Sequence, residues 1–142
     1  MISQKWTVVF HDEFELEFQN LAPAVRRELL STALAVQQMG PDADRPHVGT
    51  LSNAKHPNMK ELRFTANGGA EIWRVAFAFD PERKAIVLVA GDKQGVNEKL
   101  FYKRLLYVAN ARLDRHLAGL AKRAKSAHST ERRPTSTAKK GK

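Results

Sequence analysis

The strongest constraint on the fold lies in residues 60–80, KELRFTANGGAEIWRVAFAFD, where two alternating stretches flank the turn sequence NGG. On each side of the turn, apolar residues alternate with polar or small ones, which predicts two strands joined as a β-hairpin. With the two glycines at the centre of the turn, Phe64 faces Trp73 across the hairpin. A slip of one residue would turn the aromatic side chains to the opposite face, so the register is well specified.

The same register places Arg63 directly opposite Arg74 on the other face of the hairpin. Like charges that face each other destabilise a sheet unless a negative group lies near them. One interpretation is that a carboxylate of the chain, such as Glu61 or Glu71, neutralises the two arginines. The other is that this face binds a phosphodiester, because guanidinium groups match the geometry of phosphate and small side chains next to Arg74 leave room for a ligand.

The rest of the chain predicts an α+β fold. Its patterns indicate a small antiparallel sheet with an N-terminal helical hairpin and a C-terminal helix packed on one side. Asn97 is placed to cap the last helix, whose apolar residues repeat at helical spacing up to Leu120. The expected elements are a strand at 5–10, helices at 12–21 and 23–40, strands at 59–64, 71–79 and 84–91, and a helix that follows residue 97.

The positive charge is concentrated near the C-terminus. Residues 122–142 hold eight of the 24 Lys and Arg residues but one of the 15 Asp and Glu residues, and so carry +7 of the formal charge of +9. This segment is poor in apolar residues, which predicts a disordered basic tail after a folded domain at 1–121. The tail either adds affinity for RNA through phosphate contacts or serves only to keep the protein soluble.

Several classes of protein do not fit this sequence. It has no cysteine, no apolar stretch of the length that crosses a bilayer, and no apolar segment of signal-peptide type near its N-terminus. It also lacks the motifs of common zinc enzymes, nucleotide-binding loops and serine hydrolases. We therefore expect a cytoplasmic protein that uses no metal and no cofactor.

Four further residues are candidates for the same face as the two arginines. The segment GDKQG, residues 91–95, follows the last predicted strand and presents Asp92 and Lys93 at the edge of the sheet. His56 and Lys60 precede the first arginine along the chain. An ordinary polar turn and a solvated loop histidine are the alternative interpretations of these residues.

The chain resembles the RelE/ParE toxin superfamily, and within it the HigB-like, phage-derived toxins of toxin–antitoxin modules. The resemblance rests on NMKELRF, WRVAFAFDP, LVAGDK and the helix FYKRLLYVANARLDRHL, and it covers about residues 5–120. It implies a fold of the microbial-ribonuclease type, in which a helical hairpin packs on an antiparallel sheet. It also implies metal-independent cleavage of messenger RNA, in many relatives on the ribosome, and an antitoxin partner of helix-turn-helix type that forms a hetero-oligomer with the toxin.

The resemblance also implies roles for individual residues. Arg63, Arg74 and Lys93 match positions where relatives place phosphate-binding basic residues. Asp92 stands where many relatives have another basic residue, so the sequence departs from the pattern there. For proton transfer, Asp92 is a candidate base with either His56 or Tyr102 as the acid. The residues expected to contact RNA are Lys60, Arg63, Arg74, Lys93 and Tyr102.

Three functions remain open at this point. The resemblance and the opposed arginines favour a toxin that cleaves messenger RNA and so inhibits translation. The same fold also occurs in ParE-type toxins, which poison DNA gyrase through protein contacts. The third alternative is an RNA-binding module without catalytic activity, for which the basic tail supplies the affinity.

Overall fold

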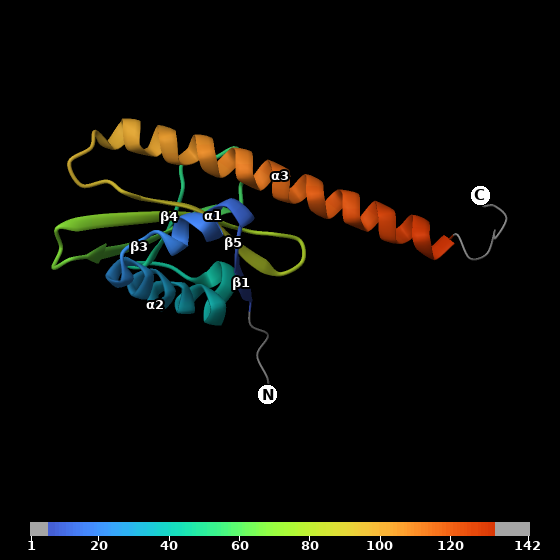
Figure 1. The fold of residues 1–142 in the computed structure, drawn as a ribbon, viewed down its shortest axis with the longest axis horizontal. Coiled ribbons are helices and arrows are strands. Elements are labelled where there is room, and N and C mark those ends of the chain that lie inside the picture. The colour runs from blue at the N-terminus through green and yellow to red at the C-terminus, as the bar shows by residue number, and fades with distance from the viewer. Residues whose placement is uncertain (1–5, 133–142) are drawn as a thin grey trace.

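The computed structural model describes residues 6–132, and the predicted α+β class is confirmed there (Figure 1). A sheet lies between a pair of short N-terminal helices and one long C-terminal helix. In chain order the elements are β1 (Thr7–Phe10), α1 (Asp12–Gln19), α2 (Pro23–Met39), the 3₁₀ helix η1 (Gly40–Asp42), β2 (Val48–Thr50), β3 (Met59–Ala66), β4 (Glu71–Phe79), β5 (Lys84–Asp92) and α3 (Glu98–Arg132).

The five strands form one sheet in the order β1-β5-β4-β3-β2. The predicted register of the hairpin is confirmed, since Phe64 pairs with Trp73 and Arg63 pairs with Arg74. The strands β3, β4 and β5 pair antiparallel, as expected, and β2 also pairs antiparallel with β3. The strand β1 pairs with β5 in parallel. The strand β2 was not predicted, because three residues are too short for an alternating pattern to be recognised.

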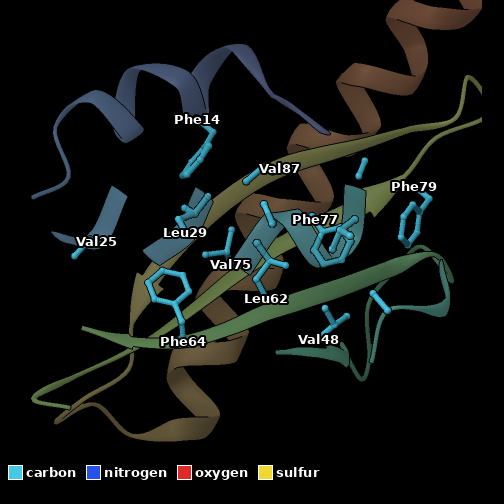
Figure 2. Packing of buried hydrophobic residues seen from close by; sticks show 14 of the residues in the cluster. Phe14, Val25, Leu29, Val48, Leu62, Phe64, Val75, Phe77, Phe79 and Val87 are labelled. Atoms are coloured by element: carbon cyan, nitrogen blue, oxygen red, sulfur yellow. The ribbon is translucent and has the colours of Figure 1, made fainter. Parts of the chain in front are cut away.

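The first core lies between the sheet and the helices α1 and α2 (Figure 2). Pro23 occupies the first turn of α2, where its missing N–H group costs no helical hydrogen bond. One stripe of this helix, Val25, Leu29, Ala33 and Val36, is buried against the sheet. The spacing of these four residues had predicted a single apolar face, and this prediction is confirmed.

A second core covers the opposite face of the sheet. The inward stripe of α3, which includes Phe101, Leu105, Ala109 and Leu113, packs there against β4 and β5. The expectation that all helices lie on one side of the sheet is therefore wrong. The small residues at positions 76 and 78 of β4 do not leave an open ligand site, because they lie in the core that α3 covers.

The helix α3 has 35 residues, which corresponds to a length of about 52 Å. Its predicted cap is confirmed, since Asn97 Oδ1 accepts a hydrogen bond from Leu100 N at 3.0 Å. The prediction of disorder from Lys122 onward is wrong for residues 122–132, which continue α3; alanine, lysine and arginine favour helix, and the next proline is Pro134. The rest of the predicted tail, 133–142, lies outside the described residues. Within residues 6–132, α3 and the other helices all lack an apolar stretch long enough to cross a membrane.

A buried arginine fastens α3 to the rest of the fold. The pairing of β4 with β5 is irregular between Ala76 and Phe77, where Leu88 has no direct partner. Arg112 is only 8% exposed, and its Nη1 atom donates to the carbonyl oxygen of Leu88 at 2.7 Å. The same atom donates to Oε1 of Glu17 on α1 at 2.9 Å, and this hydrogen bond raises the pKa of Arg112. One guanidinium thus joins α3, α1 and β5.

Candidate functional site

The two opposed arginines share one carboxylate. Glu61 lies two residues before Arg63 on the same face of β3, and its side chain is 3% exposed. Its Oε2 atom accepts a hydrogen bond from Arg63 Nε at 2.8 Å, and its Oε1 atom is 3.9 Å from Arg74 Nε. Of the two carboxylates considered from the sequence, Glu61 is the one between the arginines, whereas Glu71 bonds to Trp73 and to the turn.

Tyr102 contacts Glu61 and Arg74 from the helix α3, which covers this face of the sheet. It projects from the first turns of α3, and its hydroxyl donates to Glu61 Oε1 at 2.9 Å. The hydroxyl oxygen of Tyr102 in turn accepts a hydrogen bond from Arg74 Nε at 3.2 Å. Burial raises the pKa of Tyr102, and the negative charge of Glu61 raises it further, so the phenol keeps its proton at neutral pH. We call Glu61, Arg63, Arg74 and Tyr102 the arginine cluster.

A groove opens onto the arginine cluster. It has a volume of about 1210 Å³ and is lined by residues 50–53, by the N-terminal part of α3, and by Glu61 and Arg63. The side chain of Arg63 is 31% exposed and that of Arg74 is 16% exposed, so Arg63 is the more accessible of the two. Lys99 and Lys103 of α3 also line the groove. An anion that enters it therefore meets positive charge on the helix and at the cluster.

A glycine on β2 makes room for the accessible arginine. A β-carbon added to Gly49 would lie 2.5 Å from Nη2 and 2.6 Å from Cζ of Arg63, well inside van der Waals contact. The guanidinium group therefore lies against the bare backbone of β2. This requirement could not be recognised from the sequence, because β2 itself was not predicted.

Lys93 lies on the same face of the sheet as Arg74. Its amide donates to the carbonyl oxygen of Ile72 at 2.8 Å, and Ile72 precedes Arg74 by two residues, so the two positions share a face. The Nζ atom of Lys93 is 3.5 Å from Oε1 of Glu98, at the start of α3. Lys93 thus follows the end of β5 on the face that carries Arg74, and Glu98 is its partner there.

Two other candidates lie on the opposite face. Asp92 pairs with Trp73 rather than with Arg74, and its Oδ1 atom accepts hydrogen bonds from the amides of Ile72 and Gln94 at 2.9 and 3.0 Å. It therefore caps a turn. Lys60 pairs with Phe77, and its Nζ atom donates to the carbonyl oxygen of Pro41 at 2.9 Å. The expectation that these two residues converge with the arginines is wrong, because side chains alternate between the faces of a strand.

His56 is likewise outside the arginine cluster. Its Nε2 atom is 2.8 Å from Asp114 Oδ1, and Lys55 Nζ is 2.9 Å from Asp114 Oδ2. The hydrogen bond from Lys55 lowers the pKa of Asp114, and the bond from His56 acts in the same direction. Asp114 follows Tyr102 by twelve residues along α3, a separation of about 18 Å. The structure thus gives His56 a partner on α3, away from the cluster.

The sequence predicted that Glu61 lies beside Arg63 but not that it also contacts Tyr102. Its spacing of two residues from Arg63 on one strand predicts a shared face, and this signal made Glu61 a candidate to neutralise charge. The contact with Tyr102 spans 41 positions of the chain. It depends on how α3 crosses the sheet, which no local pattern reveals.

Comparisons with known proteins come from a family model and from curated sequences. Residues 16–114 match the family model described as "Phage derived protein Gp49-like (DUF891)". The chain is 40% identical over 92 residues to "Putative toxin HigB2" of Mycobacterium tuberculosis, a match that covers 64% of this chain and 45% of the relative. It is 41% identical over 83 residues to "Putative toxin HigB3" of the same organism, which covers 58% of this chain and 68% of the relative. The chain thus spans less than half the length of the first relative and about two thirds of the second.

Among solved structures, the chain is similar to the Escherichia coli toxin RelE, in the form of a double arginine-to-alanine mutant in the free state. The two share 13% of their residues and superpose with a TM-score of 0.49. The match covers 72% of this chain and 95% of the RelE chain.

Proposed function

The chain belongs to the Gp49-like family of phage-derived proteins, and from this premise we propose that it is the toxin of a toxin–antitoxin pair and that it cleaves messenger RNA. Support comes from the names of the two mycobacterial relatives, both of which are described as toxins. Inhibition of translation in the cytoplasm is the consequence that we expect.

The observation that carries this proposal is the charge of the arginine cluster. Arg63 and Arg74 share the single carboxylate of Glu61, and Tyr102 is neutral, so the cluster retains one positive charge. Arg63 reaches the groove, and its guanidinium can form paired hydrogen bonds with a phosphate. An RNA strand in the groove would therefore place a phosphodiester against the cluster.

The side chains of the cluster match the requirements of RNA cleavage. In this reaction the ribose 2′-hydroxyl attacks the adjacent phosphate as its proton passes to water in the groove, and the bond from phosphorus to the 5′-oxygen of the next nucleotide breaks. Negative charge grows on the phosphate oxygens in the transition state. Arg63, Arg74 and Lys93 stabilise that charge, because positive groups held in place in a partly buried site act most strongly where charge develops. Tyr102 keeps its proton at neutral pH, since its pKa is raised. In the reaction its hydroxyl turns from Glu61 Oε1 and donates this proton to the leaving oxygen.

The proposed partners follow from the same site. We infer that the substrate is messenger RNA on the ribosome, and that an antitoxin of helix-turn-helix type silences the protein. Because α3 already covers the sheet face, the antitoxin would block the mouth of the groove rather than the sheet itself. An acidic segment of the antitoxin would suit the positive charge of Arg63, Lys99 and Lys103.

The test is induced expression of the wild type, of Arg74→Ala and of Arg27→Ala, with growth curves and mapping of transcript 5′ ends. Arg74→Ala leaves Glu61 paired with Arg63, so no buried carboxylate is left without a partner. Arg27 is exposed on α2 and serves as the matched control. We expect growth arrest and new transcript ends with the wild type and with Arg27→Ala, and neither with Arg74→Ala.

Two results would contradict the proposal. If Arg74→Ala cleaved RNA as fast as the wild type, the arginine cluster would not take part in the reaction. Growth arrest with intact transcripts and with broken DNA would instead indicate a toxin that acts on gyrase. Circular dichroism of each purified variant checks that the substitution has left the fold unchanged.

A further inference from the structure

The C-terminal part of α3 extends beyond the two cores. Leu120, at 9% exposed, is the last buried residue that the structure describes on this helix. Every side chain from position 121 to 127 is exposed, and the helical backbone continues to Arg132. Figure 1 shows this part of α3 leaving the sheet and running on without another element beside it. We call residues 121–127 the basic arm.

The described side chains of the basic arm offer only positive charge to a partner. Residues 121–127 read AKRAKSA, with no acidic residue and no apolar side chain larger than alanine. An amphipathic helix that docks in a protein groove, or that lies in a membrane surface, needs an apolar stripe, which this sequence lacks. The arm therefore fits a partner that is recognised through its negative charge.

The basic residues of the arm also differ from those earlier on α3. Arg112 and Arg115 form ion pairs with carboxylates of α1. Lys122, Arg123 and Lys125 take part in none of the ion pairs found among the described side chains. Lys122 and Lys125 are three positions apart, so they project from neighbouring points of the helix surface. Among the side chains that the structure describes, their charges have no partner.

We propose that the basic arm is a second RNA-binding surface, which holds phosphates of a folded RNA helix. Lys122 follows Tyr102 by twenty residues on the same helix, a separation of about 30 Å. The arm and the arginine cluster therefore contact different parts of an RNA, or of a particle that contains RNA. The arm contributes affinity through phosphate contacts, independently of base sequence.

The experiment measures binding of the full-length chain to a blunt RNA duplex of about 20 base pairs, longer than the ~16 base pairs that small duplex-binding domains span. Every protein carries Arg74→Ala, so that no cleavage complicates the binding curve. The arm variant is Lys122→Gln/Lys125→Gln. The matched control is Arg27→Gln/Arg45→Gln, which removes the same charge from exposed residues elsewhere. Glutamine has nearly the helix propensity of lysine, so α3 should persist, and circular dichroism checks this.

Fluorescence anisotropy over salt concentrations from about 50 to 200 mM gives the result. We expect the arm variant to bind the duplex at least tenfold more weakly than the parent at low salt. The magnitude of the slope of log K against log salt should fall by about 1.5, because each of the two lost phosphate contacts contributes about 0.7–0.9 to that slope. The control should keep the slope of the parent. The proposal would be overturned if the arm variant and the control variant bound the duplex equally well. It would also be overturned if the arm variant lost binding to vesicles that contain phosphatidylserine but kept its binding to the duplex.

This result is independent of the proposed cleavage. Binding is measured with the arginine cluster already inactivated, so failure of the catalytic assignment leaves the expected binding unchanged. Conversely, a basic arm without affinity for the duplex leaves the cleavage test of Arg74→Ala as it stands.

Discussion

Arg112 Nη1 donates to the carbonyl oxygen of Leu88 at 2.7 Å, at the point where β5 loses its regular pairing with β4. A strand irregularity leaves a backbone group without its ladder partner, and a buried group of this kind is costly unless another donor reaches it. Here that donor belongs to α3. The irregularity in the sheet and the position of the helix are therefore linked through one hydrogen bond.

Substitution of Arg112 should therefore weaken the whole fold. Arg112→Met keeps much of the side-chain volume but leaves the Leu88 carbonyl without its donor, so we expect the free energy of unfolding to fall by about 2–3 kcal/mol. Urea denaturation followed by circular dichroism measures this change. Arg115→Met is the control, because Arg115 is 55% exposed and its ion pair lies in solvent. An equal loss in the two variants would show that the bond to Leu88 has no special weight.

Removal of the shared carboxylate should also destabilise the protein. Glu61→Gln leaves two partly buried arginines facing each other without a negative charge, and we expect a loss of about 3 kcal/mol in the free energy of unfolding. The double variant Glu61→Gln/Arg63→Gln removes one of the opposed charges and should recover part of this loss. Glu71→Gln, at the turn end of β4, provides the comparison. A Glu61→Gln variant as stable as the wild type would contradict the role of Glu61.

Tyr102 should titrate above the ordinary tyrosine value of about 10. The chain has two tyrosines, so Tyr107→Phe leaves Tyr102 as the sole phenol for an ultraviolet titration. Burial and the charge of Glu61 raise the pKa of Tyr102 in the folded state. A group whose pKa is raised on folding contributes stability that is complete below its unfolded pKa and is lost as the pH rises through its folded pKa. We therefore expect stability to decline above about pH 10.

The control for this titration is Glu61→Gln in the Tyr107→Phe background. Loss of the neighbouring negative charge should move the phenol midpoint downward. Circular dichroism at each pH shows whether the chain is still folded. A midpoint at the ordinary value in both proteins would mean that Tyr102 is not buried beside Glu61.

The space beside Arg63 can be tested through glycine. Gly49→Ala would bring a methyl group within 2.5 Å of the guanidinium, so Arg63 must move, and we expect a loss of about 1–3 kcal/mol together with weaker RNA cleavage. In Gly119→Ala the nearest atom to the new methyl group is the flexible end of Arg123, at 3.3 Å. This helical position should gain about 0.5–1 kcal/mol instead. Thermal unfolding of the two variants measures these changes. A Gly49→Ala variant as stable as the wild type would contradict the packing of Arg63 against Gly49.

The choice between His56 and Tyr102 as proton donor can be made with two variants. Tyr102→Phe removes the hydroxyl from the arginine cluster, and we expect the rate of RNA cleavage to fall by about a hundredfold or more. His56→Gln alters the contact with Asp114 and should leave the rate nearly unchanged. Single-turnover cleavage of a labelled RNA measures both. The opposite pattern would return the role of the acid to His56.

The β-hairpin could be predicted from sequence because its information is local. Phe64 and Trp73 must face the same core, and the NGG turn fixes which residues pair, so the opposition of Arg63 and Arg74 follows. The partners of these arginines depend on segments far along the chain. Glu61 was visible as a neighbour on the strand, whereas Tyr102 reaches the cluster only because α3 crosses this face of the sheet.

The covering of the second face illustrates why such features escape a sequence-based prediction. The alanines of β4 fit equally well beside a ligand or beneath a helix, since a small side chain permits either approach. Only the stripe of α3 that begins with Phe101 decides between them, and it buries the alanines. Asp92 and Lys60 failed as candidates for a related reason, because proximity along the chain does not fix the face on which a strand residue lies.

The arginine cluster holds two positive groups and one negative group, and this imbalance affects which mutations the protein tolerates during evolution. Loss of either arginine still leaves Glu61 with one positive partner, so a copy that loses Arg63 or Arg74 keeps no unpaired buried carboxylate, while the proposed phosphate contact is weakened. The proposed cleavage can thus be lost in one mutational step without loss of the folded chain. Such an inactive descendant would persist as a stable protein and continue to occupy any partner that recognises its surface.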